Sequence, residues 1–157
     1  MGNYEIRHFE TVTDDLVDMF KVLNKDMNGH SPLRIEYGED CFHDLNEMTD
    51  SFIAYKENKP VGCAILVEKS KEVGVITNIY VAPECRRDGL CFKLFEVVEN
   101  QAKIRGHLML LSDTWNELIP MQKAFLKGGY KRYEVVPGTK WEIGYYSAGH
   151  NYWKLLV

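Results

Sequence analysis

The spacing of apolar side chains predicts that the chain begins with a strand followed by a helix. Over Tyr4–Phe9, apolar and polar residues alternate weakly, as they do in a half-buried strand. Four apolar residues then recur at the i, i+3, i+4 and i+7 spacing of one helical face: Leu16, Met19, Phe20 and Leu23. Thr13 is placed to cap this helix, and Asn28–Pro32 is expected to end it. A second, shorter helix is predicted over Cys41–Met48.

The pattern then changes to that of strands, and later it alternates between helix and strand. Proline, glycine and β-branched residues mark where these elements begin and end. Strands are predicted over residues 51–56, 61–67, 73–81, 107–111, 130–136 and 152–157, and helices over residues 89–106 and 119–127. The resulting order, β-α-α-β-β-β-α-β-α-β-β, is typical of an α+β fold built around one mixed sheet.

Composition narrows the class of protein. The 157 residues are 45% hydrophobic and 27% charged, which is typical of a soluble globular chain, and their number suits one domain over residues 1–157. No apolar run approaches the roughly 20 residues of a membrane span, so no membrane partner is expected and the cytoplasm is the predicted compartment. Nineteen basic and 23 acidic residues give a net charge of −4, which disfavours a nucleic-acid partner.

The cysteines indicate neither a disulfide framework nor a metal centre. Cys41, Cys63, Cys85 and Cys91 form no CxxC pair. Cys41 and His43 are close in sequence, but the second pair of ligands that a tetrahedral zinc site requires is missing. No metal is therefore expected.

The most informative segment is the turn that follows the strand ending at Val81. It contains Arg86 and Arg87, and Gly89 stands directly before a predicted helix. The first amides of a helix lack intrahelical partners and carry about half a positive charge, which suits an anionic phosphate. A glycine lets such a group approach the backbone, and arginines add cationic contacts. The residues therefore predict a phosphate cradle, and the alternative is an exposed loop whose arginines are solvated.

Two motifs in this order resemble those of the GCN5-related N-acetyltransferase (GNAT) superfamily. The first is the family's acetyl-CoA loop, Arg/Gln-x-x-Gly-x-Gly/Ala after a strand ending in hydrophobic-x-Val-x-Pro. Here Ile79–Pro83 is followed by Arg86–Cys91, with Cys91 in place of the usual glycine or alanine. The second is the family's helix end Phe-Tyr-x-x-x-Gly-Phe, which appears as Ala124–Tyr130. The predicted order of strands and helices agrees over nearly the whole chain.

The resemblance implies a mostly antiparallel mixed sheet in which Val73–Val81 and the strand from His107 splay apart in a V. It also implies acetyl-CoA as co-substrate, with pantetheine in the gap and the diphosphate over residues 86–91. The cofactor-binding residues that follow from it are Ile79, Tyr80, Val81, Arg86, Arg87, Asp88, Gly89, Leu90, Cys91, Asn116 and Phe125.

The catalytic groups depart from the family pattern. Some members carry a glutamate base in the middle of the strand, but counting eleven residues back from Arg86 reaches Val75. Asp113 is the preferred candidate base, and Glu72 and Glu142 are weaker ones. The family's tyrosine acid is replaced by Phe125, which cannot donate a proton. Tyrosines that could take over this role are Tyr80, Tyr130 and Tyr133, and Tyr80 is preferred.

Two interpretations of the function stay open at this point. The first is an N-acetyltransferase acting on a primary amine of a small molecule or a peptide amino terminus. The second is a catalytically silent CoA-binding module of the same fold, which the missing glutamate and Phe125 favour. Acidic residues on the expected acceptor side favour a cationic acceptor: Asp26, Glu36, Glu39 and Asp40.

Cys91 and the aromatic residues near the C-terminus each have two interpretations. Cys91 at a helix start is either a reactive thiolate or a small packing residue, and packing is preferred because no base is identifiable beside it. Aromatic residues gather toward the C-terminus, around a connection of 15 residues from Pro137 to Asn151. They either line the acceptor pocket or form edge packing, which includes the contact of a homodimer. These aromatic residues are Trp115, Trp141, Trp153, Tyr145, Tyr146 and Tyr152.

Overall fold

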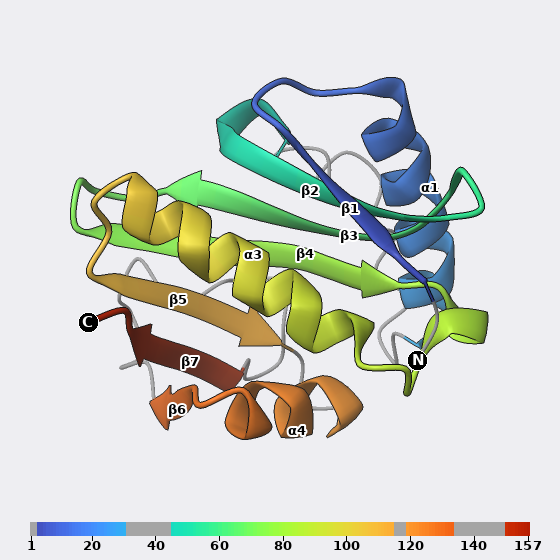
Figure 1. The fold of residues 1–157 in the computed structure, drawn as a ribbon. Coiled ribbons are helices and arrows are strands. Elements are labelled where there is room, and N and C mark those ends of the chain that lie inside the picture. The colour runs from blue at the N-terminus through green and yellow to red at the C-terminus, as the bar shows by residue number, and fades with distance from the viewer. Residues whose placement is uncertain (1–2, 31–44, 115–118, 134–149) are drawn as a thin grey trace.

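The computed structural model describes residues 3–30, 45–114, 119–133 and 150–157. Its strands form one sheet in the order β1-β2-β3-β4-β5-β7-β6 (Figure 1). The strands are β1 (Glu5–Phe9), β2 (Met48–Lys56), β3 (Lys59–Glu68), β4 (Val73–Val81), β5 (Met109–Thr114), β6 (Lys131–Tyr133) and β7 (His150–Leu155). The helices are α1 (Asp14–His30), α3 (Leu90–Ile104) and α4 (Ile119–Lys127), with a 3₁₀ turn η1 (Pro83–Cys85). All strand pairs are antiparallel except β4 with β5, so the predicted α+β fold is confirmed.

Most predicted elements are present, and the differences lie at their ends. The strand over 73–81 and the helix over 119–127 have the predicted bounds. Thr13 caps α1 as expected, since its Oγ1 accepts a hydrogen bond from the Leu16 amide at 3.2 Å. The second predicted helix extends too far along the chain, because helix is found at residues 45–47 and Met48 already belongs to β2. Residues 41–44 of that prediction lie outside the described residues.

Helices cover both faces of the sheet and produce two apolar cores. In Figure 1, α3 and α4 lie on the near face and α1 lies behind the sheet. Alternation along β2 explains how one strand serves both cores, since Phe52 and Ala54 pack on the α3 side while Ile53 and Tyr55 pack on the α1 side. No described helix is long and apolar enough to cross a membrane.

A bulge in β4 changes the face that its last residues meet. Two residues of β4, Asn78 and Ile79, stand opposite the single residue Ala64 of β3. Asn78 has a φ of 53°, a left-handed conformation that asparagine tolerates better than most residues. As a result, Ile76 packs in the core under α3, whereas Tyr80 packs in the core under α1. In an unbroken strand, residues four apart would lie on the same face.

The parallel strands β4 and β5 stay together only at their beginnings. Among the described residues, Val73–Val75 of β4 have register partners on β5, and these are Met109–Leu111. The buried Ser112 hydroxyl then donates a hydrogen bond to the Ile76 carbonyl at 2.8 Å. Beyond that point β5 continues its pairing with β7 alone, and the two strands separate toward the end where α3 begins (Figure 1). This is the V-shaped splay that the resemblance implied.

Candidate functional site

The chain turns sharply between the end of β4 and the start of α3. After η1, Arg87 and Gly89 both adopt left-handed conformations, with φ values of 62° and 78°. Gly89 is the residue directly before α3, where any side chain beyond hydrogen would strain the backbone. The backbone conformation therefore explains the glycine, and the close approach of a ligand at Gly89 stays a prediction.

The start of α3 carries no side-chain cap. Gly89 occupies the N-cap position and supplies no side-chain hydrogen bond, whereas the start of α1 is capped by Thr13. The first amides of a helix have no intrahelical partner and lie at the positive end of its dipole. Across 15 residues of helix, this arrangement suits an anion at the turn over residues 86–91. We call this turn the phosphate cradle.

Arg86 braces the cradle against the end of β4. Its Nε donates a hydrogen bond to the Val81 carbonyl at 2.9 Å, and its guanidinium carbon lies 5.7 Å from the centre of the Tyr80 ring. Arg87 is exposed at the tip of the same turn. Arg86 thus bonds to the end of β4, and both arginines are exposed to solvent.

Cys91 lies in the first turn of α3 and behaves as a packing residue. It is half-buried against the α3-side core, directly after the buried Leu90. Burial raises the pKa of the Cys91 thiol to about 12. The thiol is therefore protonated near neutral pH, which favours packing over the reactive alternative.

The two preferred catalytic candidates lie on the two strands that diverge. Tyr80 is on β4 after the bulge, and its side chain is 6% exposed among the residues packed under α1. Asp113 is on β5, two residues after Leu111, the last β5 residue that has a register partner on β4. The side chain of Asp113 lies outside what the structure describes. Their roles stay predictions, as does the cofactor contact of Asn116, which is outside the described residues.

Phe125 lies in the core, away from open surface. Its side chain is 1% exposed, and its ring stacks on Tyr152 at 4.9 Å and on Phe95 at 5.3 Å between ring centroids. The position that corresponds to the family's tyrosine is thus the centre of an aromatic cluster. A contact of this ring with a cofactor stays a prediction.

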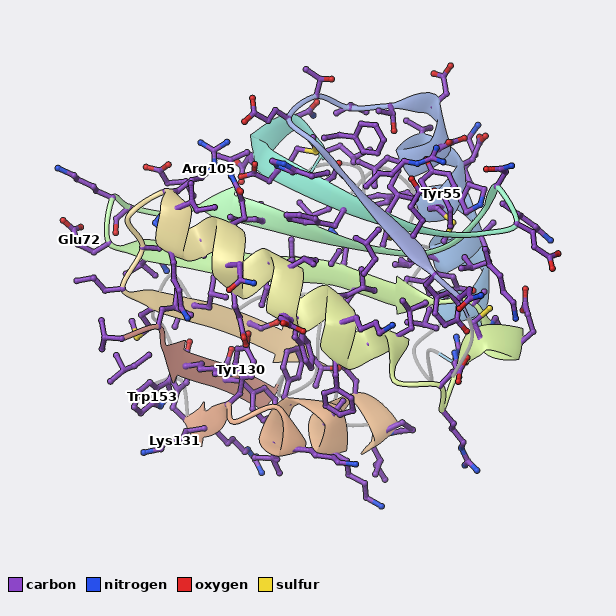
Figure 2. All side chains as sticks on the ribbon, in the orientation of Figure 1. Tyr55, Glu72, Arg105, Tyr130, Lys131 and Trp153 are labelled. Carbon is purple, nitrogen blue, oxygen red and sulfur yellow. The ribbon has the colours of Figure 1, made fainter. Side chains whose placement is uncertain are left out.

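The weaker catalytic candidates are dispersed. Glu72 precedes β4 at the closed end of the V. Figure 2 shows it at the end of the sheet opposite to the start of α3. Its position argues against a role as base. Tyr130 is buried beside Phe125, and burial together with Glu99 raises the pKa of its phenol well above the usual value. Tyr133 ends β6, and Glu142 lies outside the described residues.

Sequence patterns alone do not reveal two features of this site. The bulge at Asn78 has only a weak signal, namely that asparagine is one of the few residues that readily adopt a left-handed conformation. The second feature is Tyr4, whose hydroxyl donates a hydrogen bond to the Asp88 carboxylate at 2.7 Å. These two residues are 84 positions apart, and no local pattern signals such a contact.

The uncapped start of α3 thus lies at the end of the sheet where β4 and β5 diverge. The sequence matches the acetyltransferase (GNAT) family over residues 13–130, and the chain belongs to that family. No curated protein sequence matches it significantly.

Solved structures of acetyltransferases share the fold. An acetyltransferase from Streptococcus agalactiae is 21% identical, with a TM-score of 0.76 over 97% of this chain and 98% of that one. A GNAT family acetyltransferase from Elizabethkingia anophelis with acetyl-CoA bound is 20% identical, with a TM-score of 0.73 over 98% of each chain. N-acetylglutamate synthase from Neisseria gonorrhoeae, complexed with coenzyme A and N-acetyl-glutamate, is 15% identical, with a TM-score of 0.73 over 98% of this chain and 35% of that one.

Proposed function

We propose that this chain is an acetyl-CoA-dependent N-acetyltransferase, formed by one domain over residues 1–157. The acceptor is a primary amine of a small molecule or a peptide amino terminus. The observation that carries the proposal is the uncapped start of α3 behind Gly89, at the end of the sheet where β4 and β5 separate. Family membership and the acetyl-CoA in the Elizabethkingia anophelis structure support the same cofactor here.

The residues present fit the parts of acetyl-CoA. The amides of residues 86–91 would hold the diphosphate, with Arg87 available at the tip of the turn. The backbone of Ile79–Val81 would hold the pantetheine arm, because this part of β4 has no register partner on β5 among the described residues. Acetyl-CoA supplies an acyl group that is already activated as a thioester.

The proposed reaction is direct attack by the amine. A carbon–nitrogen bond forms at the thioester carbonyl, the carbon–sulfur bond breaks, the amine loses a proton and the thiolate gains one. Asp113 is the proposed base, acting through water, and Tyr80 the proposed acid. What supports this pair is that Asp113 belongs to β5 and Tyr80 to β4, the two strands that diverge. A thiolate with a pKa of about 8.5 also leaves with little assistance.

Gly89→Val tests the cradle. The substitution puts a branched side chain at a φ of 78°, directly before the first amides of α3. We expect it to weaken acetyl-CoA binding at least about tenfold, or about 1.4 kcal/mol, in isothermal titration calorimetry. Gly106→Val is the matched control, since Gly106 also has a positive φ, lies just beyond the other end of α3, and would place its added Cβ with no atom within 4 Å. It should cost stability and leave CoA affinity unchanged.

An unchanged affinity for acetyl-CoA in folded Gly89→Val would overturn the proposed phosphate cradle.

A second measurement distinguishes an enzyme from a silent binding module. It is the release of free thiol from acetyl-CoA with a panel of polyamines, aminoglycosides, amino acids and peptides. Turnover that weakens as salt rises would agree with a cationic acceptor. Binding of acetyl-CoA without thiol release from any amine would favour the silent module, which the residues Val75 and Phe125 support.

A further inference from the structure

The phosphate cradle contains a carboxylate, that of Asp88, between Arg87 and Gly89. A negative charge at this place opposes a diphosphate, because like charges a few ångströms apart repel each other. The amides of the turn and the α3 dipole attract the ligand, whereas Asp88 repels it. The affinity of the cradle therefore depends on where the Asp88 carboxylate is held.

The structure holds that carboxylate from outside the cradle. The Tyr4 hydroxyl donates a hydrogen bond to Asp88 Oδ2 at 2.7 Å. Tyr4 stands directly before β1, and Figure 1 shows the N-terminal end of that strand beside the turn that leads into α3. A residue from the start of the chain thus fixes the cradle across 84 positions of sequence.

Tyr4 is itself firmly placed. Its ring packs against the α3-side core, and the Lys56 ammonium lies 5.8 Å from the ring centre. The strand that follows is paired with β2 along its whole length, from Glu5 opposite Tyr55 to Phe9 opposite Ser51. The hydrogen bond to Asp88, together with partial burial, raises the pKa of the Tyr4 phenol well above its usual value. The hydroxyl therefore remains a donor through the neutral range.

We propose that Tyr4 is a positioning residue for the diphosphate of acetyl-CoA. By fixing the Asp88 carboxylate, it keeps that charge away from the amides that receive the ligand. This inference rests on the proposed CoA-binding function. It assigns a role in cofactor affinity to a residue that precedes the edge strand β1, which is separated from β4 in the sheet by β2 and β3.

The test is Tyr4→Phe, with Tyr55→Phe as its matched control. Tyr55 also donates its hydroxyl to an aspartate, Asp15 of α1, at 2.7 Å, so each variant loses one tyrosine–aspartate hydrogen bond. Of these two bonds, only that of Tyr4 reaches the cradle. In calorimetry with CoA we expect Tyr4→Phe to bind about tenfold more weakly and Tyr55→Phe to stay within about twofold of the wild type. Their melting temperatures control for any general loss of stability.

A double-mutant cycle shows whether Tyr4 acts through the Asp88 charge. Asp88→Asn removes the charge and keeps the shape, so CoA should bind more tightly to this variant than to the wild type. In the Asp88→Asn background, Tyr4→Phe should change the affinity less than about twofold. The defect of Tyr4→Phe alone should also shrink at high salt, since screening reduces a repulsion between charges. A loss of packing alone would produce neither result.

Several outcomes overturn the inference. One is that Tyr4→Phe binds CoA as tightly as the wild type. Another is that Tyr4→Phe weakens CoA binding equally in the wild type and in the Asp88→Asn background. A third is a defect in Tyr55→Phe as large as that in Tyr4→Phe. If the wild type itself binds no CoA, the proposed function fails and this inference falls with it, whereas the first three outcomes leave the proposed function standing.

Discussion

At the scale of single residues, the environment of Cys91 decides between two opposite chemistries. Its place in the first turn of a helix would favour a thiolate, because the helix dipole stabilises a negative charge there. Burial has the opposite effect and raises the pKa of this thiol to about 12. Cys91 therefore packs as a small apolar residue. Its small size is what it shares with the glycine or alanine that the family prefers at this position.

We therefore expect Cys91 to resist alkylation. Near pH 8, a pKa of about 12 in place of an ordinary thiol's value lowers the thiolate fraction roughly a thousandfold. Iodoacetamide labelling, followed by mass spectrometry of the peptide that contains Cys91, should be slow in the native protein and fast in denaturant. Rapid labelling of the native protein at Cys91 would contradict the packing role and restore the reactive interpretation.

Phe125 carries a second prediction at this scale. Because its ring is enclosed by Phe95 and Tyr152, Phe125→Leu should lower the free energy of unfolding by about 1–3 kcal/mol. The rate of thiol release should fall by well under the 10²–10⁴-fold that loss of a general acid causes. Urea denaturation and thiol release measure the two effects. A collapse of the rate with stability and CoA affinity intact would reveal a direct role in catalysis.

At the scale of elements, the sequence predicts those bounds of strands and helices that depend on the local spacing of residues. The strand over Val73–Val81 and the helix over Ile119–Lys127 have their predicted bounds, because proline and glycine mark their ends. The end of α4 shows why the second motif, Ala124–Tyr130, can be recognised in the sequence. Gly129 has a φ of 90°, and the Tyr130 amide donates to the Phe125 carbonyl at 3.0 Å, so the glycine lets the chain close the helix.

What the sequence does not predict depends on contacts between distant segments. The β4 bulge places Tyr80 under α1, while the period of two would place it with Ile76 under α3. Likewise, Lys154 of β7 donates to Glu99 of α3 at 2.9 Å and to the Gly128 carbonyl after α4 at 2.8 Å. Figure 2 shows Tyr130 in this same region between α3 and α4. Within the candidate site, the sequence motif predicts the phosphate cradle, but it does not predict the contact of Tyr4 with that cradle.

At the scale of the whole molecule, α3 is anchored at the end opposite the cradle. Asp50 of β2 is fully buried, and Arg105, just after α3, donates two hydrogen bonds to its carboxylate. Gln101 donates a third at 3.1 Å, and His8 of β1 bonds to it at 2.6 Å. His8, Glu10 and Asp50 also lie close enough together to hold a metal ion, but the Arg105 guanidinium already supplies the positive charge there. The network joins β1, β2 and α3.

This network makes part of the stability depend on pH. Burial alone would raise the pKa of the Asp50 carboxyl, but the hydrogen bonds from Arg105 and His8 outweigh burial and hold it below its usual value. A carboxyl whose pKa is lowered by folding contributes stability above its unfolded pKa of about 3.9, and this contribution is lost as the pH falls through the folded value. We therefore expect acid below about pH 4 to release the C-terminal end of α3.

Asp50→Asn tests this anchor. It leaves the Arg105 charge without its buried partner, so the free energy of unfolding at pH 7 should fall by about 3 kcal/mol in urea denaturation. Glu10→Gln is the control, because Glu10 pairs with the same guanidinium at 3.7 Å while largely exposed, and it should cost less than about 0.5 kcal/mol. The gap between wild type and Asp50→Asn should be constant near neutral pH and should narrow as the pH falls from about 4 through the lowered folded pKa of Asp50. A gap of constant size over that range would show that Asp50 acts through its shape and not through its charge.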